Sequence, residues 1–442
     1  MRITEKRGTT PVASRSRGWR FTHAAYLALF AGTLAACDQI TSLDQEAPSR
    51  VIATDLYQPE NAQLLVTSAI SDFECALTQY IVAAGLVGDE LIDAQLSQAG
   101  WDYDRRTVVP SLPAYSTSGC GSIQVPGYYT PLAIARATAD KITTALEGWT
   151  DQQVPNRQAL LATAAAHAGY ALVLLGESSC SAAIDGGPEL TPVQVLTEAE
   201  SRFTKAITAA QAANNTDILN MARVGRARAR VDLKKFADAK TDASLVPDSY
   251  VHNATYSAAV ARRENLIQTQ FFRGLFSSVD PSFRNLTVGG VPDTRVPVVD
   301  AGVNGQDGQT RIWRSTKYPL ISSPIPIASG DEAILLTAEA DLEAGNVTAA
   351  VAGINKLRTK SSLPQYAGGT AAEVRAQLID ERRRELYLEG QRFSDIIRFN
   401  IPQSPAAGTP FPVKGGVYGN QICFPLPDVE RNNNPTLGGK TS

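Results

Sequence analysis

The sequence predicts a mostly α-helical fold that carries one irregular, loop-rich insertion with short strands. Two observations lead to this class. Apolar residues recur at close to a 3.6-residue period over several segments in both halves of the chain, as amphipathic helices require. Between about residues 250 and 330 that period is lost, and glycine and proline become frequent. Such punctuation indicates turns and short strands instead of helices.

The periodic segments define the expected helices. In the first half they cover residues 61–85, 131–149, 156–175, 197–213 and 218–246, the last with a break near residues 233–236. In the second half they cover residues 331–344 and 347–360, followed by a helix that begins at Thr370. Thr370 and Glu373 form a capping box, in which each side chain satisfies a backbone amide of the other. We expect this helix to run to about residue 390.

The break inside residues 218–246 has the pattern of a helical hairpin. Leu233 and Phe236 mark the turn, and small residues such as Ala239 follow where two antiparallel helices must approach closely. This pattern resembles part of a tetratricopeptide repeat, and residues 342–350 loosely echo it. The match is partial, because no clean 34-residue period runs through the chain.

The N-terminus has the pattern of a lipoprotein signal peptide. Six basic residues precede residue 21, and an uncharged apolar run of fourteen residues, broken only by His23, follows to Leu34. That run is too short to span a bilayer, which takes about 20 residues, and it is typical of a secretory signal. It ends in Leu-Ala-Ala-Cys at Cys37, which resembles the bacterial lipobox. We therefore expect cleavage after residue 36 and a lipid on Cys37, the alternative being a plain signal peptide with an accidental cysteine.

Cleavage would leave an acidic protein. The removed segment holds six bases and one acid, so 35 Lys and Arg stand against 43 Asp and Glu in the mature chain, a net charge of about −8. Nucleic acid is excluded as an expected partner, because phosphate binding needs a basic footprint. Residues 37–49 are polar and are expected to form a flexible lipidated tether.

Four further cysteines are expected to form two disulfides. Cys75, Cys120, Cys180 and Cys423 lie far apart, without metal-ligand spacing. Outside the cytoplasm an even number of cysteines favours disulfides over buried thiols. Four cysteines allow three connectivities, and the sequence does not choose among them.

Candidate ligand-binding residues lie in two irregular segments. Residues 97–129 read as a long aromatic-rich excursion, and long ordered loops are uncommon unless they have a function. Sugar rings stack on aromatic side chains, while their hydroxyls need polar partners, which residues 89–105 supply. We expect Trp101, Tyr103 and Trp313 to be stacking platforms, although each could equally be a packing residue.

Residues 381–398 carry the most specific motif. They read Glu-Arg-Arg-Arg-Glu-Leu-Tyr-Leu-Glu-Gly-Gln-Arg-Phe-Ser-Asp-Ile-Ile-Arg. This resembles the C-terminal signature of the SusD/RagB family, with Ile396 where the family has leucine. The helix pair at residues 331–360 and the Phe-Pro-Leu-Pro and Asn-Pro segments of residues 424–435 agree with it. The four extra cysteines depart from the typical members.

The resemblance implies a fold and a function. The fold would be a right-handed superhelical scaffold of tetratricopeptide-like hairpins over residues 50–249 and 331–400, with an insertion at 250–330 and an extended tail at 401–442. The function would be capture of an oligosaccharide or similar nutrient at the outer-membrane surface. The protein would be lipid-anchored, facing outward, and would deliver its ligand to a SusC-like TonB-dependent β-barrel transporter.

The charged residues of the motif have a structural interpretation. Glu381 and Arg384, Arg382 and Glu385, and residues 389 and 392 stand three apart, so each pair can meet on a helix surface. We expect some of these ions to be partly buried and to fix how the last helix meets the insertion. Catalysis is not expected there, since neither residue type has an evident reason for a perturbed pKa.

No enzymatic activity, cofactor or metal site is expected. His167 and His252 are isolated, and His167 lies in an alanine-rich helix as a core residue would. No nucleophile-elbow, zinc-protease, phosphate-loop or dinucleotide motif is present in the sequence. The alternative function is a helical-repeat scaffold lipoprotein for envelope protein assembly, which would need neither the insertion nor the aromatic loop.

Overall fold

The computed structural model describes residues 53–438. The signal peptide at residues 1–36, Cys37 and the tether at 37–49 therefore lie outside the described residues. Residues up to Leu56 form a separate unit, of which the short helix α2 (Ala53–Leu56) is described. Everything from Tyr57 onward forms one unit, which contains the whole fold discussed below.

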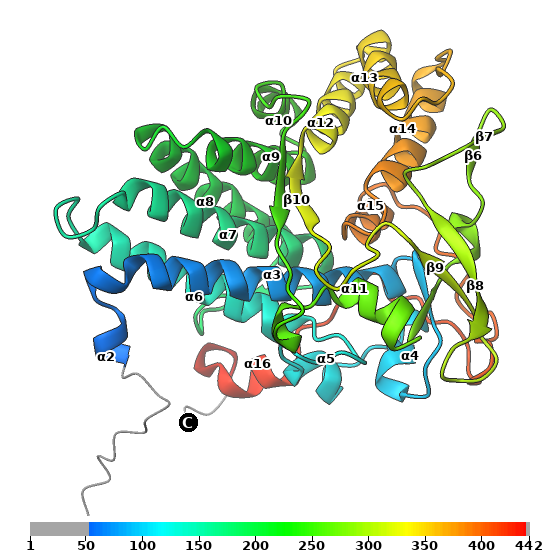
Figure 1. Ribbon diagram of the computed structural model, residues 1–442, viewed down its shortest axis with the longest axis horizontal. Helices are drawn as coiled ribbons and strands as arrows, with labels where there is room; N and C mark the ends of the chain where they lie inside the picture. The colour runs from blue at the N-terminus through cyan, green and yellow to red at the C-terminus, as the bar shows by residue number, and fades with distance from the viewer. Residues whose placement is uncertain (1–52, 439–442) are drawn as a thin grey trace, which may run out of the picture. The chain divides into compact units, whose positions relative to one another are not determined.

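The first half of that unit is a helical scaffold. Neighbouring helices pack in sequence as hairpins, α6 on α7, α7 on α8 and α8 on α9, while α3 lies against α6 and α7 (Figure 1). Their bounds are α3 (Ala62–Val87), α6 (Tyr129–Gly148), α7 (Arg157–Ser178), α8 (Pro192–Ala212), α9 (Thr216–Asp232) and α10 (Phe236–Ala243). The expected break at residues 233–236 is the α9–α10 turn, so the hairpin prediction is confirmed.

Close helix packing explains two glycines of the scaffold. Gly169 on α7 and Gly225 on α9 both face the ring of Phe203 on α8. A Cβ atom at either position would come within 2.8 Å or 2.3 Å of that ring. Because both glycines lack a side chain, α8 can insert the large ring of Phe203 between α7 and α9.

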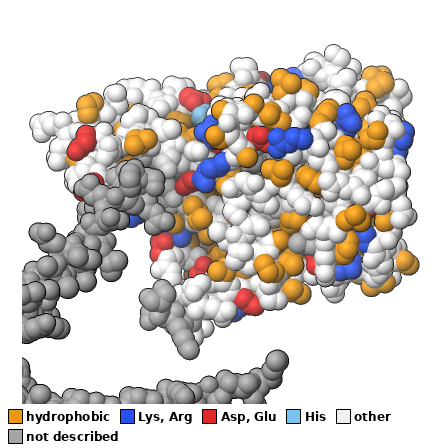
Figure 2. Space-filling view, turned by 60° about the horizontal axis from the view of Figure 1, so that its bottom comes forward, with side chains coloured by type: hydrophobic (Ala, Val, Ile, Leu, Met, Phe, Trp, Pro, Cys, Tyr) orange, Lys and Arg blue, Asp and Glu red, His pale blue; other side chains and the backbone are white. Residues whose placement is uncertain are grey.

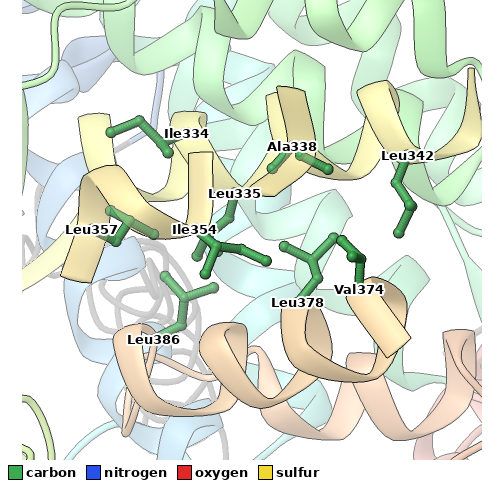
Figure 3. Packing of buried hydrophobic residues seen from close by; sticks show 10 residues of the cluster. Ile334, Leu335, Ala338, Leu342, Ile354, Leu357, Val374, Leu378 and Leu386 are labelled. Atoms are coloured by element: carbon green, nitrogen blue, oxygen red, sulfur yellow. The ribbon is translucent and has the colours of Figure 1, made fainter. Parts of the chain in front are cut away.

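The second half of the scaffold is built from α12 (Gly330–Glu343), α13 (Val347–Lys360), α14 (Ala371–Glu385) and α15 (Arg392–Arg398). Leu335, Ile354 and Leu378 meet in the apolar core between α12, α13 and α14 (Figure 3). The capping box at the start of α14 is present. The expected end of this helix near residue 390 was wrong, because the chain leaves the helix after Glu385 and turns through Leu388 and Gly390, both at positive φ.

Short strands connect the irregular segments. β4 (Val251–Ala254) pairs with β10 (Ile325–Ser329), β1 (Leu91–Asp93) with β5 (Ser277–Val279), and β8 (Val298–Asn304) with β9 (Arg311–Ser315), all antiparallel. Two smaller pairs are β2 (Ala182–Ala183) with β3 (Glu189–Leu190), and β6 (Thr287–Val288) with β7 (Val291–Pro292). The expectation of an insertion with small strands is confirmed.

Short helices interrupt segments that were expected to be irregular. They are α4 (Gln98–Asp104), α5 (Pro113–Thr117), α11 (Leu266–Gln268) and α16 (Asp428–Asn433). The C-terminal tail is accordingly not extended throughout. The fold is mostly α-helical, with tetratricopeptide-like hairpins, as the sequence predicts.

Two helices in the range 53–438 are long and apolar enough to cross a membrane, at Pro59–Val87 and Arg157–Ser178. In each, 83% of the apolar window is buried inside the protein. Their composition therefore reflects their central place in the core, where a helix is apolar on every side.

Candidate functional site

The irregular segments converge into one region, which we call the loop platform and define as residues 89–127, 266–320 and 401–427. In Figure 1 α4 and the β8–β9 hairpin lie beside each other, away from the α6–α7 turn. Backbone hydrogen bonds join the parts, since the Asp307 amide donates to the Ala94 carbonyl and the Gly419 amide to the Arg105 carbonyl. Three segments far apart in sequence therefore act as one surface.

Lys414 forms ion pairs with two of these segments. Its ammonium group lies 2.7 Å from Oδ2 of Asp93, 2.8 Å from the Asp93 carbonyl oxygen and 3.1 Å from Oδ2 of Asp307. The side chain of Lys414 is 4% exposed and those of both aspartates are fully buried. One cation thus joins the tail to β1 and to the β8–β9 hairpin in a water-poor setting, where its loss would leave two uncompensated charges.

The acids expected to bind sugar hydroxyls instead have partners within the protein. Asp89 accepts a hydrogen bond from the Ser404 amide, and Glu90 accepts one from the Leu388 amide. Burial raises the pKa of Asp89 to about 6, of Glu90 to about 7 and of Asp93 to about 6. These shifts have structural causes, so they carry no argument for catalysis.

Tyr103 is not available to a ligand in this structure. Its side chain is fully buried, its hydroxyl donates to the Pro126 carbonyl, and its ring packs edge-on against Tyr115 and Phe424. Tyr103 is two residues after the partly exposed Trp101 and therefore points to another side of α4, a distinction that composition does not contain. We therefore withdraw it as a stacking platform.

Trp101 and Trp313 are both partly exposed, on different parts of the loop platform. Trp101 lies on α4, and its indole Nε1 is buried without a hydrogen-bond partner among the described residues. Trp313 lies on β9 opposite Asp300, and its amide donates to Ser278 Oγ on β5. The guanidinium of Arg284 lies 5.1 Å from the centre of the Trp313 ring. Both tryptophans stay candidates for ligand stacking.

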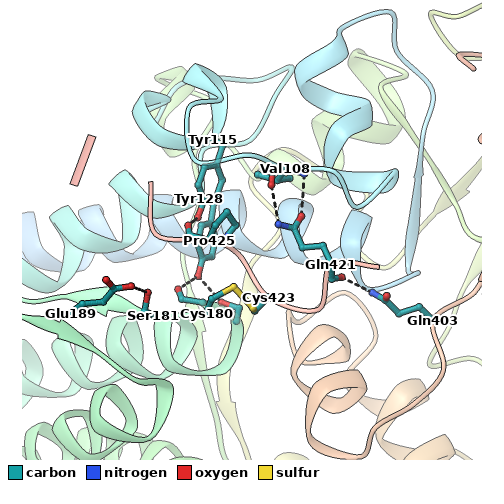
Figure 4. The surroundings of a disulfide bond; sticks show 12 residues. Val108, Tyr115, Tyr128, Cys180, Ser181, Glu189, Gln403, Gln421, Cys423 and Pro425 are labelled. Carbon is teal, nitrogen blue, oxygen red and sulfur yellow. Dashed lines mark hydrogen bonds between the residues drawn. A yellow bond between two sulfur atoms is a disulfide. The ribbon is translucent and has the colours of Figure 1, made fainter. Parts of the chain in front are cut away.

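Two disulfides bond segments of the loop platform to the helical scaffold. They confirm the expected pairing of four cysteines in two bonds. Cys75 on α3 is bonded to Cys120 in the excursion, and Cys180 after α7 is bonded to Cys423 in the tail. Beside the second bond, Tyr128 and Tyr115 stack at 5.6 Å, and Gln421 exchanges two hydrogen bonds with the backbone of Val108 (Figure 4).

The charged residues of the C-terminal motif do not pair with each other in the expected way. Glu381 is bound by Arg295 at 2.6 Å and by Arg358 at 3.1 Å, not by Arg384. Arg295 also binds Glu385 at 3.0 Å. Because Arg295 belongs to the insertion, the prediction that buried ions fix the insertion against this helix is confirmed, although the local pairs were wrong.

Other ions of the motif also have partners more than one helical turn away, although Arg383 and Arg384 bind Asp380 within α14 as well. Arg382 binds Asp395 at 2.9 Å, Arg384 binds Asp293 at 3.2 Å, and Glu389 binds Lys317 at 2.8 Å. Helix surface geometry alone favours partners three or four residues away. Here burial removes competing water, so the partners are chosen by what packs against the helix instead.

Sequence reasoning missed several residues of the platform. Lys414 and Arg284 gave no signal, because a single basic residue in a loop is ordinary. Leu96 and Val413 are 67% and 45% exposed, and Val413 adopts a φ of 67°, which is unusual for a β-branched residue. A reader of the sequence would assign such residues to the core.

Two hollows of the described residues lie apart from the aromatic candidates. One open hollow of about 690 Å³ lies between α10 and the end of α12, beside Phe236 and Glu343, and another of about 320 Å³ lies between α10, α12 and α13. Figure 2 shows one face of the molecule, where apolar groups are scattered between charges of both signs.

The histidines do not form a chemical site. His167 is buried, burial lowers its pKa to about 4, and its Nδ1 lies 2.8 Å from the Thr163 carbonyl oxygen. His252 pairs with Asp217 at 2.9 Å. Between residues 53 and 438 no cluster of three or more His, Cys, Asp or Glu side chains is placed to hold a metal ion.

Comparison with known proteins shows which proteins have a similar sequence motif and a similar fold. The model of the SusD family matches residues 332–438. A SusD superfamily protein from Bacteroides vulgatus is similar in structure, with 15% identity, a TM-score of 0.63, and coverage of 86% of this chain and 97% of its own. No curated protein sequence matches the chain.

Two further solved structures have the same likeness. Surface glycan-binding protein A from Bacteroides uniformis is 15% identical, with a TM-score of 0.63 and coverage of 86% of this chain and 98% of its own. A laminarin-binding SusD-like protein is 14% identical, with a TM-score of 0.62 and coverage of 84% and 96%. At these identities the likeness shows a shared fold.

Proposed function

We propose that this chain is a member of the SusD family, whose model matches residues 332–438, and that it is a glycan-binding lipoprotein that captures an oligosaccharide on its loop platform. The observation that carries the proposal is a helical scaffold that holds three irregular segments in fixed positions through buried ions and disulfides. A pure repeat scaffold has no need of such a platform. Solved relatives named for binding laminarin and surface glycans support the same ligand class.

Trp101 and Trp313 are the proposed stacking residues, each presenting part of its ring at the surface. A glycan array with the full chain, repeated with Trp101→Ala and Trp313→Ala, tests this assignment. We expect at least one change to weaken binding to the best ligand by about tenfold, since aromatic residues dominate recognition surfaces. Trp149→Ala at the end of α6, outside the platform, is the matched control. If neither platform change weakens any hit, the site assignment is wrong.

Delivery to a TonB-dependent β-barrel transporter is the second part of the proposal. A lipid on Cys37 would hold the protein on the outward face of the outer membrane, and residues 38–49 would act as its tether. Tethering keeps a weak partner at high effective concentration. Cys37→Ser should therefore release the protein from the membrane fraction, while its fold and glycan binding are retained.

Co-purification distinguishes the proposal from the alternative role in envelope assembly. Recovery of a large β-barrel with the tagged chain supports the transporter partnership. Recovery of assembly factors without such a barrel would favour the scaffold function. The comparison is informative because both roles predict the same helical hairpins and the same anchor.

A further inference from the structure

Charge pairing around Trp313 is incomplete. Most arginines in the described part of the chain lie within 4.0 Å of a carboxylate, as Arg226, Arg295 and Arg398 do. Arg284 and Arg392 have no such partner among residues 53–438. Arg284 donates only to the Val279 carbonyl, at 2.9 and 2.6 Å. Nε of Arg392 is buried without any hydrogen bond.

Arg383 interacts with the surroundings of both arginines. Arg284 lies over Trp313, and its neighbour Phe283 has the guanidinium of Arg383 4.9 Å from its ring centre. Arg383 also donates to the Ser282 carbonyl at 3.1 Å, and its positive charge helps to lower the pKa of Arg392. We call Trp313, Arg284, Arg383 and Arg392 the basic strip.

The strip spans the junction between the insertion and the C-terminal helices. The turn that leads from α14 to α15 is bonded to the chain just after β9, since Lys317 binds Glu389 at 2.8 Å and donates to the Tyr387 carbonyl. Phe283 stacks on Tyr387 at 5.2 Å. The positions of the strip residues are therefore fixed by packing on both sides.

The described carboxylates near the strip have other partners, and none of them forms an ion pair with Arg284 or Arg392. Near Arg284, Asp300 binds Arg311 at 2.8 Å, and Asp280 accepts the Ser282 amide. The other acids that act on the strip are likewise occupied: Asp395 binds Arg382 and Arg398, Glu90 accepts the Leu388 amide, Asp89 accepts the Ser404 amide, and Asp380 binds Arg383 and Arg384.

Burial accordingly lowers the pKa of Arg284 and of Arg392, although neighbouring acids act in the opposite direction. Two partly desolvated cations that have no carboxylate of the described residues within 4.0 Å form a favourable place for an anion, because guanidinium groups bind carboxylate and sulfate oxygens through paired hydrogen bonds. The indole of Trp313 lies directly beside Arg284 and can support an apolar ring face.

We propose that the basic strip binds the anionic group of an acidic saccharide, a uronate carboxylate or a sulfate ester, while Trp313 supports the sugar ring. This inference rests on the proposed glycan-binding function and narrows its substrate class. The mature chain is acidic overall, so general attraction to polyanions does not account for such binding.

Calorimetric titration of the full chain tests the proposal with polygalacturonate and chondroitin sulfate as acidic probes and laminarin and amylopectin as neutral probes. At low salt we expect an acidic probe to bind about tenfold or more tightly than either neutral probe. Arg284→Gln and Arg392→Gln should each weaken acidic binding about tenfold, as loss of a charge-assisted hydrogen bond implies. Binding of a neutral probe should be unchanged.

Three controls distinguish a specific loss of acidic binding from a general effect of the substitution. Arg223 on α9 also lacks a carboxylate partner among residues 53–438 and donates to Asn220, so Arg223→Gln should change acidic binding less than about twofold. Arg284→Lys should restore part of the lost affinity, because it returns the charge. A thermal melt of each variant shows whether it is folded. If Arg392→Gln does not fold, the binding measurement with Arg284→Gln alone tests the proposal.

The outcomes separate the two proposals. If a neutral glycan binds and acidic probes bind no better, or if Arg223→Gln is as harmful as Arg284→Gln, the inference fails and the proposed function stands. If inorganic sulfate displaces the acidic polymer at equal anion concentration, the strip is a simple anion site and the saccharide assignment fails. If no polysaccharide of either class binds, the proposed function fails as well.

Discussion

The helical scaffold and the loop platform are held together by different forces. In the scaffold, helices that follow one another in sequence pack through apolar and small residues, as Gly169 and Gly225 do around Phe203. In the platform, segments hundreds of residues apart are joined by buried ions and by disulfides, as Lys414 and the Cys180–Cys423 bond show. The comparison indicates that the scaffold depends on local pattern, whereas the platform depends on a few specific long-range bonds.

The largest expected effect is the loss of the platform's central cation. Lys414→Met should destabilise the protein by about 3–5 kcal/mol, because it leaves the buried carboxylates of Asp93 and Asp307 without a counter-charge. Urea unfolding measures the change. Lys235→Met on the scaffold removes an exposed pair with Glu200 and should cost about 1 kcal/mol or less. Equal losses in the two variants would contradict the comparison.

Removing the second disulfide should act mainly on the tail. Cys180→Ser combined with Cys423→Ser should cost about 2–4 kcal/mol, since the bond closes a loop with a sequence separation of 243 residues. Hydrogen exchange should rise over residues 401–427 and stay slow in α7 and α8. A uniform rise across both regions would show that the platform and the scaffold unfold as one unit.

Glu90 should make stability depend on pH. Its pKa in the folded protein is raised to about 7 by burial, so the folded state binds more protons than the unfolded state between about pH 4.5 and 7. Its contribution to stability therefore falls as pH rises through that range, by up to about 2–3 kcal/mol. Urea unfolding at pH 5 and pH 8 should show a smaller loss in Glu90→Gln than in the wild type.

The exposed Glu198→Gln on α8 is the control for this pH effect, and it should leave the pH dependence of the wild type intact. An identical pH dependence in Glu90→Gln and the wild type would mean that Glu90 is not the source. The buried acids Asp89 and Asp93 also have raised pKa values, so a residual dependence of the same sign is expected in Glu90→Gln.

The smallest expected effect belongs to a local feature of the scaffold. Thr370→Ala removes the capping box at the start of α14 and should cost about 1 kcal/mol. Thermal unfolding measures it, and Thr359→Ala in α13, whose hydroxyl donates within its own helix, is the matched control. A loss above about 3 kcal/mol would mean that this cap has a tertiary role as well.

Much of the scaffold could be predicted from the sequence because its signals are local. The apolar period located α3, α6, α7, α8 and α9 to within a few residues, and Thr370 located the start of α14. The end of α14 was misjudged, since Leu388 and Gly390 turn the chain for reasons that arise from burial of the segment. Local pattern does not contain the neighbours that decide such a turn.

The candidate site was predictable only in outline. The sequence indicated that the aromatic excursion and the insertion matter, and it singled out Trp101 and Trp313. It also included Tyr103, which the structure buries against Phe424, a residue 321 positions further along the chain. Packing decides which aromatic side chains are exposed. Residue type alone could therefore not distinguish the buried Tyr103 from the partly exposed Trp101 and Trp313.

The sequence by itself determined the helical class, the number of disulfide-forming cysteines outside the signal segment, and the family motif at residues 381–398. Only the tertiary structure decided which cysteines pair, which cations meet the acids of that motif, and that Arg284 lies beside Trp313 without a carboxylate of the described residues within 4.0 Å. The physical reason is that helix period and capping act over a few residues. Ion pairing and burial, in contrast, depend on segments brought together by the whole fold.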